Sequence, residues 1–313
     1  MNNIFNQKIY LLKKFENSLC TQKYSKIRSS VYYNDEKFKS NLLNNNLIFS
    51  KSGGKRKYGF FRKNEKKFPL ITIITVVLND KRNIENTIKS VLGQNYPNLE
   101  YIIIDGSSND GTLSIIKKYE KYLDYWTSHK DNGIFDAWNV GLKLSSGKYI
   151  GFVNSGDYLS KNASNLIHNY ILRYPHREAI AGTVIKNKTY SGYFPKRINY
   201  NFNIIPSFIG FFIKLNSIKK IGMFNTKYKY LADWDFLYKF IKTYKFSAVS
   251  TNKSEVITIF DLYGFSSTIG FFKSLFQEAR IRIHNKQNII FVIFITILRP
   301  LRKFTSCLLK KIK

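Results

Sequence analysis

The stretch that decides the fold begins with LITIITVVLN, from Leu70 to Asn79. Two further apolar runs follow it, LEYIIIDGSSNDGT from Leu99 to Thr112 and GKYIGFVNSGDYL from Gly147 to Leu159. Each run is short and rich in β-branched residues, ends in polar residues, and is separated from the next run by a helix-length segment. This pattern predicts strands that are buried on both faces of a parallel sheet, with α-helical connections between them.

Two of these runs end in an acidic residue, Asp105 and Asp157. Ligands of open α/β sheets bind outside the carboxyl ends of the strands, so both carboxylates are expected to face one crevice. A carboxylate at the end of a strand can accept hydrogen bonds from a nucleotide. One that follows a tight turn such as Asn-Ser-Gly suits a divalent cation held together with substrate phosphates. Taken singly, each could equally be an ordinary loop aspartate.

The rest of the chain extends the same α/β pattern with apolar residues at helical or alternating spacing. We therefore expect a Rossmann-like, mainly parallel sheet with helices on both faces. Helices are expected over 84–92, 113–119, 134–145, 163–174, 227–242 and 268–284, and further strands over 122–128, 179–185, 189–194, 208–213, 246–249 and 256–260.

The charge is strongly positive, with 51 Lys and Arg against 20 Asp and Glu in 313 residues, a net charge of +31. Such a surplus favours polyanionic partners: nucleic acid, phosphate-bearing substrates or an anionic membrane surface. A compositional drift toward Lys, Asn, Ile, Phe and Tyr explains the same surplus without any partner. The 26 Phe and 22 Tyr residues also suit single-strand binding, but the sequence has no helix-turn-helix, RNP-like or zinc-binding motif. No nucleic acid is therefore expected.

The surplus is concentrated at the two ends. We divide the chain into a basic N-terminal extension (1–67), a main domain (68–285, with halves 68–160 and 161–285) and a basic amphipathic tail (286–313). Within the extension, SKSGGKRKYG from Ser50 to Gly59 is interpreted as a flexible basic linker. The tail contains IIFVIFITIL from Ile289 to Leu298, which is too short to span a bilayer alone. It suits either an interfacial helix on an anionic leaflet or a buried terminal element.

Cysteine usage and the N-terminus bear on location. Cys20 and Cys307 lie near opposite ends without metal-like or redox spacing, which indicates a reducing compartment. The first residues lack an apolar core of signal-peptide length. We expect a cytoplasmic protein, with a peripheral position at the inner face of the cytoplasmic membrane as a further hypothesis.

A second acidic pair lies in LADWDF, where Asp233 and Asp235 precede apolar residues at helical spacing. A carboxylate here could serve as a general base. Acids in the first turn of a helix are also favoured by the helix dipole alone, so this pattern leaves both interpretations open.

Taken together, these motifs closely resemble the catalytic core of family 2 glycosyltransferases of the GT-A fold. The resemblance is strong over about residues 69–160 and looser to about residue 285, and it rests on several linked motifs in the same order and spacing. It implies that Asp157 binds the metal, although Asn154-Ser155-Gly156-Asp157 leaves a single carboxylate where the family has an Asp-x-Asp motif. The residues that it assigns to the nucleotide pocket are Thr75, Asn79, Asp105, Asp131 and Asn154.

The resemblance also implies an activity. It is inverting transfer of a hexosyl or N-acetylhexosaminyl group from a nucleotide-diphosphate sugar, with a UDP-sugar favoured, in the synthesis of cell-surface polysaccharide or lipopolysaccharide. Asp233 would be the base, and Asp235 a structural residue or second-choice base. Mg²⁺ or Mn²⁺ would be the cofactor, and a glycan or lipid-linked sugar the acceptor. The competing hypotheses are a nucleic-acid-binding protein and a non-catalytic sugar-nucleotide binder.

Overall fold

The protein is described here by a computed structural model of residues 32–34, 51–186, 189–192, 208–245, 247–260 and 270–311. The strands of its main sheet are β2 (Lys51–Gly53), β4 (Ile71–Val77), β5 (Leu99–Asp105), β6 (Tyr125–Ser128), β7 (Tyr149–Phe152), β9 (Ala179–Ala181), β12 (Phe211–Lys214) and β13 (Ala248–Ser250). The strands of the smaller sheets are β1 (Tyr32–Asn34), β3 (Phe60–Arg62), β8 (Tyr158–Leu159), β10 (Thr183–Lys186), β11 (Thr189–Ser191) and β14 (Val256–Phe260). The helices are α4 (Ile84–Leu92), α5 (Thr112–Lys118), α6 (Ile134–Leu144), α7 (Ala163–Arg173), α8 (Leu215–Ile221), α9 (Ala232–Tyr244), α10 (Phe271–His284) and α11 (Ile289–Lys311), with the short 3₁₀ turns η1 (Lys55–Tyr58) and η2 (Glu120–Tyr122).

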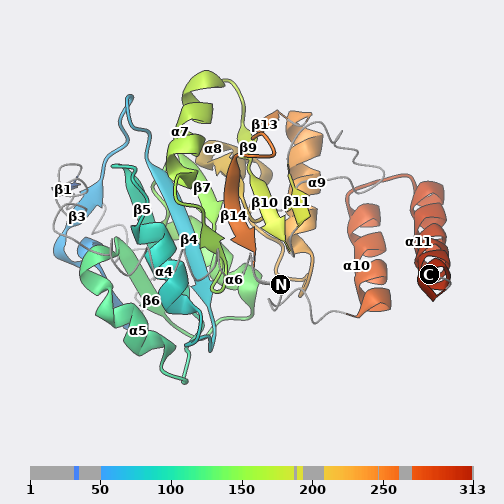
Figure 1. Ribbon diagram of the computed structural model, residues 1–313, viewed down its shortest axis with the longest axis horizontal. Coiled ribbons are helices and arrows are strands. Elements are labelled where there is room, and N and C mark those ends of the chain that lie inside the picture. Colours follow the sequence, from blue (N-terminus) through green and yellow to red (C-terminus); the bar gives the residue numbers. More distant parts are fainter. Residues whose placement is uncertain are drawn as a thin grey trace.

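The main sheet is eight-stranded, in the order β13-β9-β12-β7-β4-β5-β6-β2 (Figure 1). Its four central strands, β7, β4, β5 and β6, run parallel. β12 is antiparallel to both of its neighbours, and β2 is antiparallel to β6 at the edge. The mainly parallel α/β sheet expected from the sequence is therefore confirmed, and the carboxyl ends of β7, β4 and β5 lie side by side.

Residues of β4 alternate between two cores because successive side chains of a strand point to opposite faces. Ile74 and Val76 pack with α6 and α9 on one face, whereas Ile73 and Val77 pack with α4 and α7 on the other. All seven residues of β4 are buried, as are all seven of β5. The apolar runs of the sequence thus form the middle layer of a three-layer sandwich.

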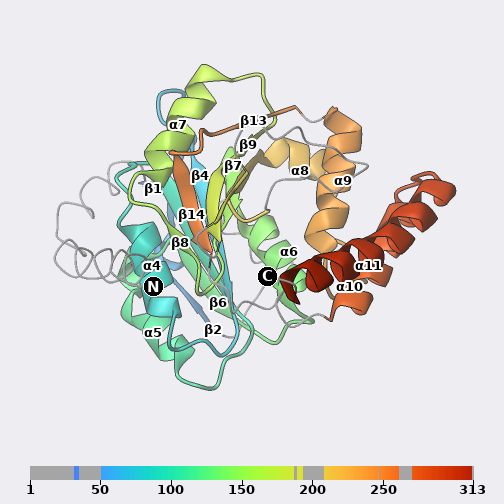
Figure 2. The same cartoon turned by 45° about the vertical axis from the view of Figure 1, so that its right-hand side comes forward.

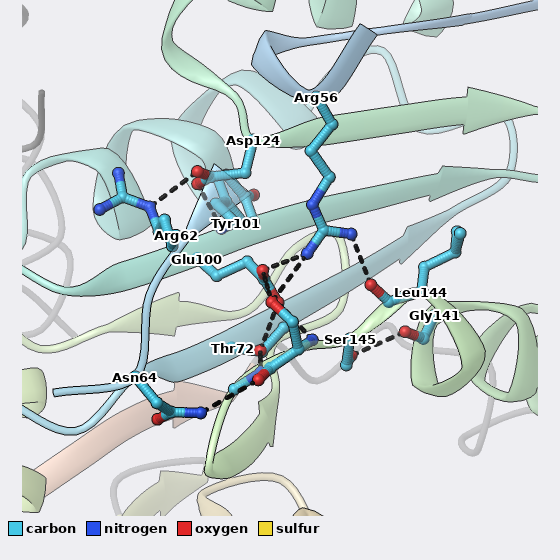
Figure 3. Close-up of polar contacts among 12 residues, drawn as sticks. Arg56, Arg62, Asn64, Thr72, Glu100, Tyr101, Asp124, Gly141, Leu144 and Ser145 are labelled. Atoms are coloured by element: carbon cyan, nitrogen blue, oxygen red, sulfur yellow. Dashed lines mark hydrogen bonds and ion pairs between the residues drawn. The ribbon is translucent and has the colours of Figure 1, made fainter. Parts of the chain in front are cut away.

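The segment interpreted as a flexible linker is part of this body, and that interpretation is wrong. β2 pairs with β6, and Arg56 of the turn that follows is 2% exposed. Its guanidinium forms an ion pair with Glu100 of β5 and donates to the Leu144 carbonyl at 2.5 Å (Figure 3). A run of basic residues in a sequence is normally exposed to solvent. The burial of Arg56 could not be predicted from charge alone, because its acidic partner Glu100 lies 44 residues away in the sequence.

A second buried pair repeats this arrangement beside the first. Arg62 Nε donates to Asp124 Oδ1 at 2.7 Å, and its guanidinium also donates to the Pro97 carbonyl at 3.1 Å. The other oxygen of Asp124 accepts the Tyr101 backbone N–H at 2.8 Å (Figure 3). These two arginines fasten residues 51–62 to the β5–β6 side of the sheet.

The chain ends in a pair of helices that stands off from the sheet beyond α9 (Figures 1 and 2). α10 packs on α9 through Ile281, which is fully buried, and α11 packs back on α10 through Val292 and Ile295. Neither helix, nor any other in the described part of the chain, is long and apolar enough to cross a membrane. Several apolar side chains of this pair remain exposed, so the first half of α11, residues 289–300, is not a buried terminal element.

The buried Arg56–Glu100 pair is expected to respond strongly to loss of one partner. Glu100→Gln removes the counter-charge of a buried guanidinium and should lower the free energy of unfolding by about 3 to 5 kcal/mol. The same change at Glu85, whose carboxylate is 33% exposed beside Lys89 and Lys118, should cost below about 1 kcal/mol. Urea unfolding of both variants measures the difference, and equal losses would contradict the structural role of the pair.

Candidate active site

The loop after β5 is organised by Asp105, which is fully buried at the end of that strand. Its carboxylate accepts the Ser108 N–H at 3.1 Å, the Ser108 hydroxyl at 2.5 Å and the Ser128 hydroxyl at 2.6 Å. The Ser128 bond ties the end of β5 to the end of β6. Asp105 therefore shapes the GSSNDGT loop with its own oxygens, and any contact with a nucleotide would share those oxygens with Ser108 and Ser128.

Asp131 lies against the same loop. A Cβ built on Gly106 would come within 2.8 Å of Asp131 Oδ2 and 3.3 Å of Leu78, so the absence of a side chain at Gly106 lets these groups meet. Burial raises the pKa of the Asp131 carboxyl, while the Gly133 N–H and the charge of His129 partly offset the rise. Leu78 is 59% exposed. The structure thus brings Asp105 and Asp131 close together at the carboxyl ends of β5 and β6, and their assignment to a nucleotide pocket stays a prediction.

The end of β4 joins the loops on either side. Asn79 adopts a left-handed conformation (φ 50°), accepts the Asn109 N–H at 2.9 Å, and donates its own N–H to the Ser108 hydroxyl at 2.8 Å. Thr75, by contrast, is fully buried within β4, where its hydroxyl donates to the Val153 carbonyl at 2.7 Å. Of these two residues assigned to the pocket, Asn79 lies in the loop just after β4, and Thr75 is buried inside the sheet.

Asp80 is a site residue that sequence reasoning missed. Its Oδ2 accepts the Ser155 hydroxyl at 2.6 Å, and its Oδ1 accepts the Asn83 side-chain amide at 2.7 Å. It thereby fixes the Asn-Ser-Gly-Asp turn to the start of α4. The available signal was its position directly after Asn79 at the end of a buried strand, which is the criterion that identified Asp105.

The turn after β7 carries Asn154 and Asp157. Asn154 Oδ1 accepts the indole N–H of Trp138 at 2.9 Å, and the Asp157 N–H donates to the Asn154 carbonyl at 2.9 Å. Gly156 closes the turn at φ 92°, a conformation that favours glycine. Asp157 is 3% exposed, and its carbonyl accepts the Thr87 hydroxyl at 2.9 Å.

The residues present at this turn fit one mode of metal binding. No cluster of three or more His, Cys, Asp or Glu with metal-ligand spacing occurs within the described ranges. A magnesium or manganese ion here would therefore need substrate oxygens to complete its shell, which is how such ions are held beside one or two carboxylates and a diphosphate. Asp157 is the residue that would bind it, on a turn already fixed from both sides by Asp80 and Trp138.

The second acidic pair opens α9, where the two carboxylates have different surroundings. Burial raises the pKa of Asp233 to about 6, and the backbone N–H groups of Asp233 and Trp234 only partly offset it. Asp235 is fully buried, contacts Lys239 Nζ at 2.7 Å and accepts the Asn285 side-chain amide at 2.7 Å. The Asp233 carboxyl therefore has a raised pKa, whereas the Asp235 carboxylate is held by its contacts with Lys239 and Asn285.

An aromatic cluster connects this helix to the turn after β7. Trp138 of α6, which binds Asn154, lies 5.0 Å from the Phe224 ring, and Phe224 stacks on Phe236 of α9 at 4.7 Å. Phe152 and Phe208 complete the cluster against Trp138 at 4.8 and 5.2 Å. The turn that carries Asp157 and the helix that carries Asp233 are therefore positioned by one packed unit.

The fold is that of the GT-A glycosyltransferases. A structure of Staphylococcus aureus TarS residues 1–349 in complex with UDP-GlcNAc matches with a TM-score of 0.54, 17% identity, and coverage of 71% of this chain and 69% of that one. A mannosyltransferase from Pyrobaculum calidifontis in complex with GDP-Man and Mn²⁺ matches with a TM-score of 0.51, 17% identity, and coverage of 71% and 64%.

The chain belongs to glycosyl transferase family 2, whose family model matches residues 72–240. An uncharacterized glycosyltransferase of Rickettsia typhi is 30% identical over 56% of this chain and 59% of its own length. The Escherichia coli UDP-Glc:α-D-GlcNAc-diphosphoundecaprenol β-1,3-glucosyltransferase WfaP is 39% identical over a stretch that covers 32% of this chain and 40% of WfaP. The chain thus spans well under two thirds of the length of these curated relatives.

The different surroundings of the two α9 carboxylates predict opposite effects on stability. The folded state keeps the Asp233 proton up to about pH 6, whereas the unfolded chain releases it near 3.8, so the free energy of unfolding falls as the pH rises through this window. Asp233→Asn removes this fall and should stabilise the protein by about 1 to 3 kcal/mol at about pH 8, with the gain lost below about pH 4.

Asp235→Asn is the matched control, because it breaks bonds to Lys239 and Asn285 and should destabilise the protein. Urea unfolding across this pH range measures both variants. A destabilised Asp233→Asn at about pH 8 would contradict the assigned surroundings of Asp233.

Proposed function

We propose that this protein is an inverting glycosyltransferase that uses a nucleotide-diphosphate sugar, with Asp233 as its general base. The observation that carries the proposal is membership of glycosyl transferase family 2, together with the position of Asp233 in the first turn of α9, where burial raises its pKa to about 6. A general base is most effective when its pKa lies near the working pH, because a large fraction of it is then ionised and it still has a high affinity for the proton. Family membership favours sugar transfer over nucleic-acid binding.

In the proposed reaction, the Asp233 carboxylate takes the proton of an acceptor hydroxyl while that oxygen attacks the anomeric carbon. The bond from this carbon to the donor diphosphate breaks, and the nucleoside diphosphate leaves from the opposite face, which inverts the anomeric configuration. Asn79, Asp105, Asp131 and Asn154 would line the nucleotide side of the site, where the loops after β4, β5 and β7 adjoin. Thr75 would not contact the nucleotide directly, because its side chain is buried inside the sheet, and it would only support the strands that position the other residues.

Mg²⁺ or Mn²⁺, bound by Asp157 together with the donor diphosphate, would supply neutralisation of the charge that develops on the leaving group. Asp80 and Trp138 would keep the turn that carries Asp157 in one conformation. The complex of the Pyrobaculum mannosyltransferase with Mn²⁺ supports a divalent cation in this fold.

The substrates can be narrowed by comparison. The Escherichia coli relative is named for a UDP-Glc donor and a diphosphoundecaprenol-linked GlcNAc acceptor. The TuaG protein of Bacillus subtilis, 36% identical over 30% of this chain, is named as a teichuronic acid biosynthesis glycosyltransferase. By analogy, we favour a UDP-sugar donor and a glycan or lipid-linked acceptor in cell-surface polysaccharide synthesis. Work on a lipid-linked acceptor would place the protein at the inner face of the cytoplasmic membrane.

Nucleotide binding tests the donor assignment. Melting temperatures measured with UDP, GDP, CMP or dTDP, each with and without Mn²⁺, should rise with one nucleotide, and more so with the metal. Saturation to about a hundred times Kd stabilises the native state by about 2.7 kcal/mol. Asp157→Ala should remove the part that depends on Mn²⁺, whereas Glu85→Ala should keep it, because the Glu85 carboxylate lies beside Lys89 and Lys118 and is partly exposed. No shift with any nucleotide would contradict the proposed donor class.

Sugar transfer tests the base. Asp233→Asn should lower kcat by about 10² to 10⁴, the usual contribution of a general base, while leaving the nucleotide-induced rise in melting temperature intact. The kcat values of the wild-type protein and Asp233→Asn are compared by measuring transfer of radiolabelled sugar from the donor identified by the binding assay. Retention of more than a tenth of the activity would exclude Asp233 as base.

A further inference from the structure

The helical hairpin formed by α10 and α11 exposes apolar side chains on its outer surface. On α10, Phe272, Phe276 and Ile283 are 61%, 66% and 49% exposed. Their spacing of four and seven residues puts them on one stripe of the helix. The opposite side of α10 is the one that packs on the fold, through Leu275 and Ile281.

The first half of α11 also exposes apolar side chains. Ile289, Ile290, Ile293, Phe294 and Ile297 are all more than half exposed, with Ile290 at 75%. Only Val292 and Ile295 between them are buried. We call the exposed apolar residues of both helices the hairpin ridge. Large apolar side chains left exposed together on neighbouring helices are typical of an interaction site.

The charges around the hairpin ridge have one sign. Lys273, Arg280 and Lys286 are exposed beside it, and the sequence from Arg280 to the last residue holds nine Lys and Arg and no acid. The sole carboxylate of α10 and α11 is Glu278, which is 3% exposed and paired with Arg282 and Arg299. The outer surface of the hairpin therefore presents apolar groups beside cations that form no ion pair with a carboxylate of the described residues, and the Lys273 ammonium lies 5.4 Å from the centroid of the Tyr230 ring.

The hairpin is bonded to the helix that carries Asp233. Asn285, just after α10, donates to the Asp235 carboxylate at 2.7 Å, and Gln277 donates to the Tyr230 carbonyl just before α9 at 2.5 Å. In both views of the molecule the hairpin lies on the outer side of α9 (Figures 1 and 2). A surface that binds the hairpin ridge would thus lie next to the half of the main domain, residues 161–285, that carries Asp233.

We propose that the hairpin ridge docks on the interface of an anionic lipid bilayer. Exposed apolar groups would insert at the headgroup boundary, and Lys273, Arg280 and Lys286 would pair with lipid phosphates, the combination that holds amphipathic helices at such surfaces. Self-association through the same face would bring these cations against one another and leave them without counter-charges. Docking of the hairpin ridge would explain how the protein reaches the membrane position given in the proposed function. The biological purpose of this docking rests on the proposed function, but the docking itself can be measured without catalysis.

The test is cosedimentation of the full chain with vesicles. The protein should bind vesicles of mixed phosphatidylglycerol and phosphatidylcholine more tightly than phosphatidylcholine alone, and high salt should weaken the binding. Phe276→Asp with Ile290→Asp should lower the partition coefficient by about tenfold or more, because two inserted side chains become charged. Leu172→Asp is the control, since Leu172 is equally apolar and 54% exposed but lies on α7.

Charge is tested separately. Lys273→Glu with Arg280→Glu should weaken binding to the anionic vesicles, whereas Lys117→Glu with Lys121→Glu on the far side should have a smaller effect. No sedimentation with any vesicle would overturn the proposal, as would equal losses in ridge and control variants. A dimer in solution that Phe276→Asp dissociates would assign the hairpin ridge to a second copy instead. Transfer to a soluble acceptor in the ridge variants reports separately on the proposed function.

Discussion

The packing of Trp138 is the interaction on which the arrangement of the site depends. Its ring lies between Phe152 at the end of β7 and Phe208 and Phe224 from the second half of the chain, and its indole N–H binds Asn154. Aromatic clusters of this kind combine large buried areas with preferred ring geometries, so they resist sliding. One side chain therefore sets both the turn that carries Asp157 and, through Phe224, the helix that carries Asp233.

The loops at the strand ends are ordered by bonds among themselves. Asp105 binds Ser108 and Ser128, Asn79 binds the loop of residues 108–109, and Asp80 binds Ser155, so the loops after β4, β5 and β7 form one connected network. Such preorganisation lowers the cost of ordering a bound donor. Buried Arg56 and Arg62 support this network from the opposite direction, because their partners Glu100 and Asp124 lie on β5 and just before β6.

The sheet could be predicted from sequence because its order follows from apolar runs whose burial on both faces leaves a local pattern. Asp105 and Asp157 could be found for the same reason, as acids at the ends of such runs. Asp80 meets the same criterion, directly after Asn79 at the end of a buried strand, although its bond to Ser155, 75 positions away, leaves no trace in the sequence. Trp138 could not be found, since its importance lies in a contact with a residue 16 positions away. The role of Arg56 could not be predicted for a related reason. Burial of its charge depends on Glu100, which is distant in the sequence, and composition does not show which residues pair.

The measurement that tests the central claim most directly is the pH dependence of kcat/KM for sugar transfer, because this ratio reports the ionisation of the free enzyme. If Asp233 is the base, the rate should fall about tenfold for each pH unit below about 6, where its carboxylate becomes protonated. The rate should be level above that pH until another group titrates. A profile that stays flat through this region would contradict the assignment of Asp233, and with it the mechanism built on α9.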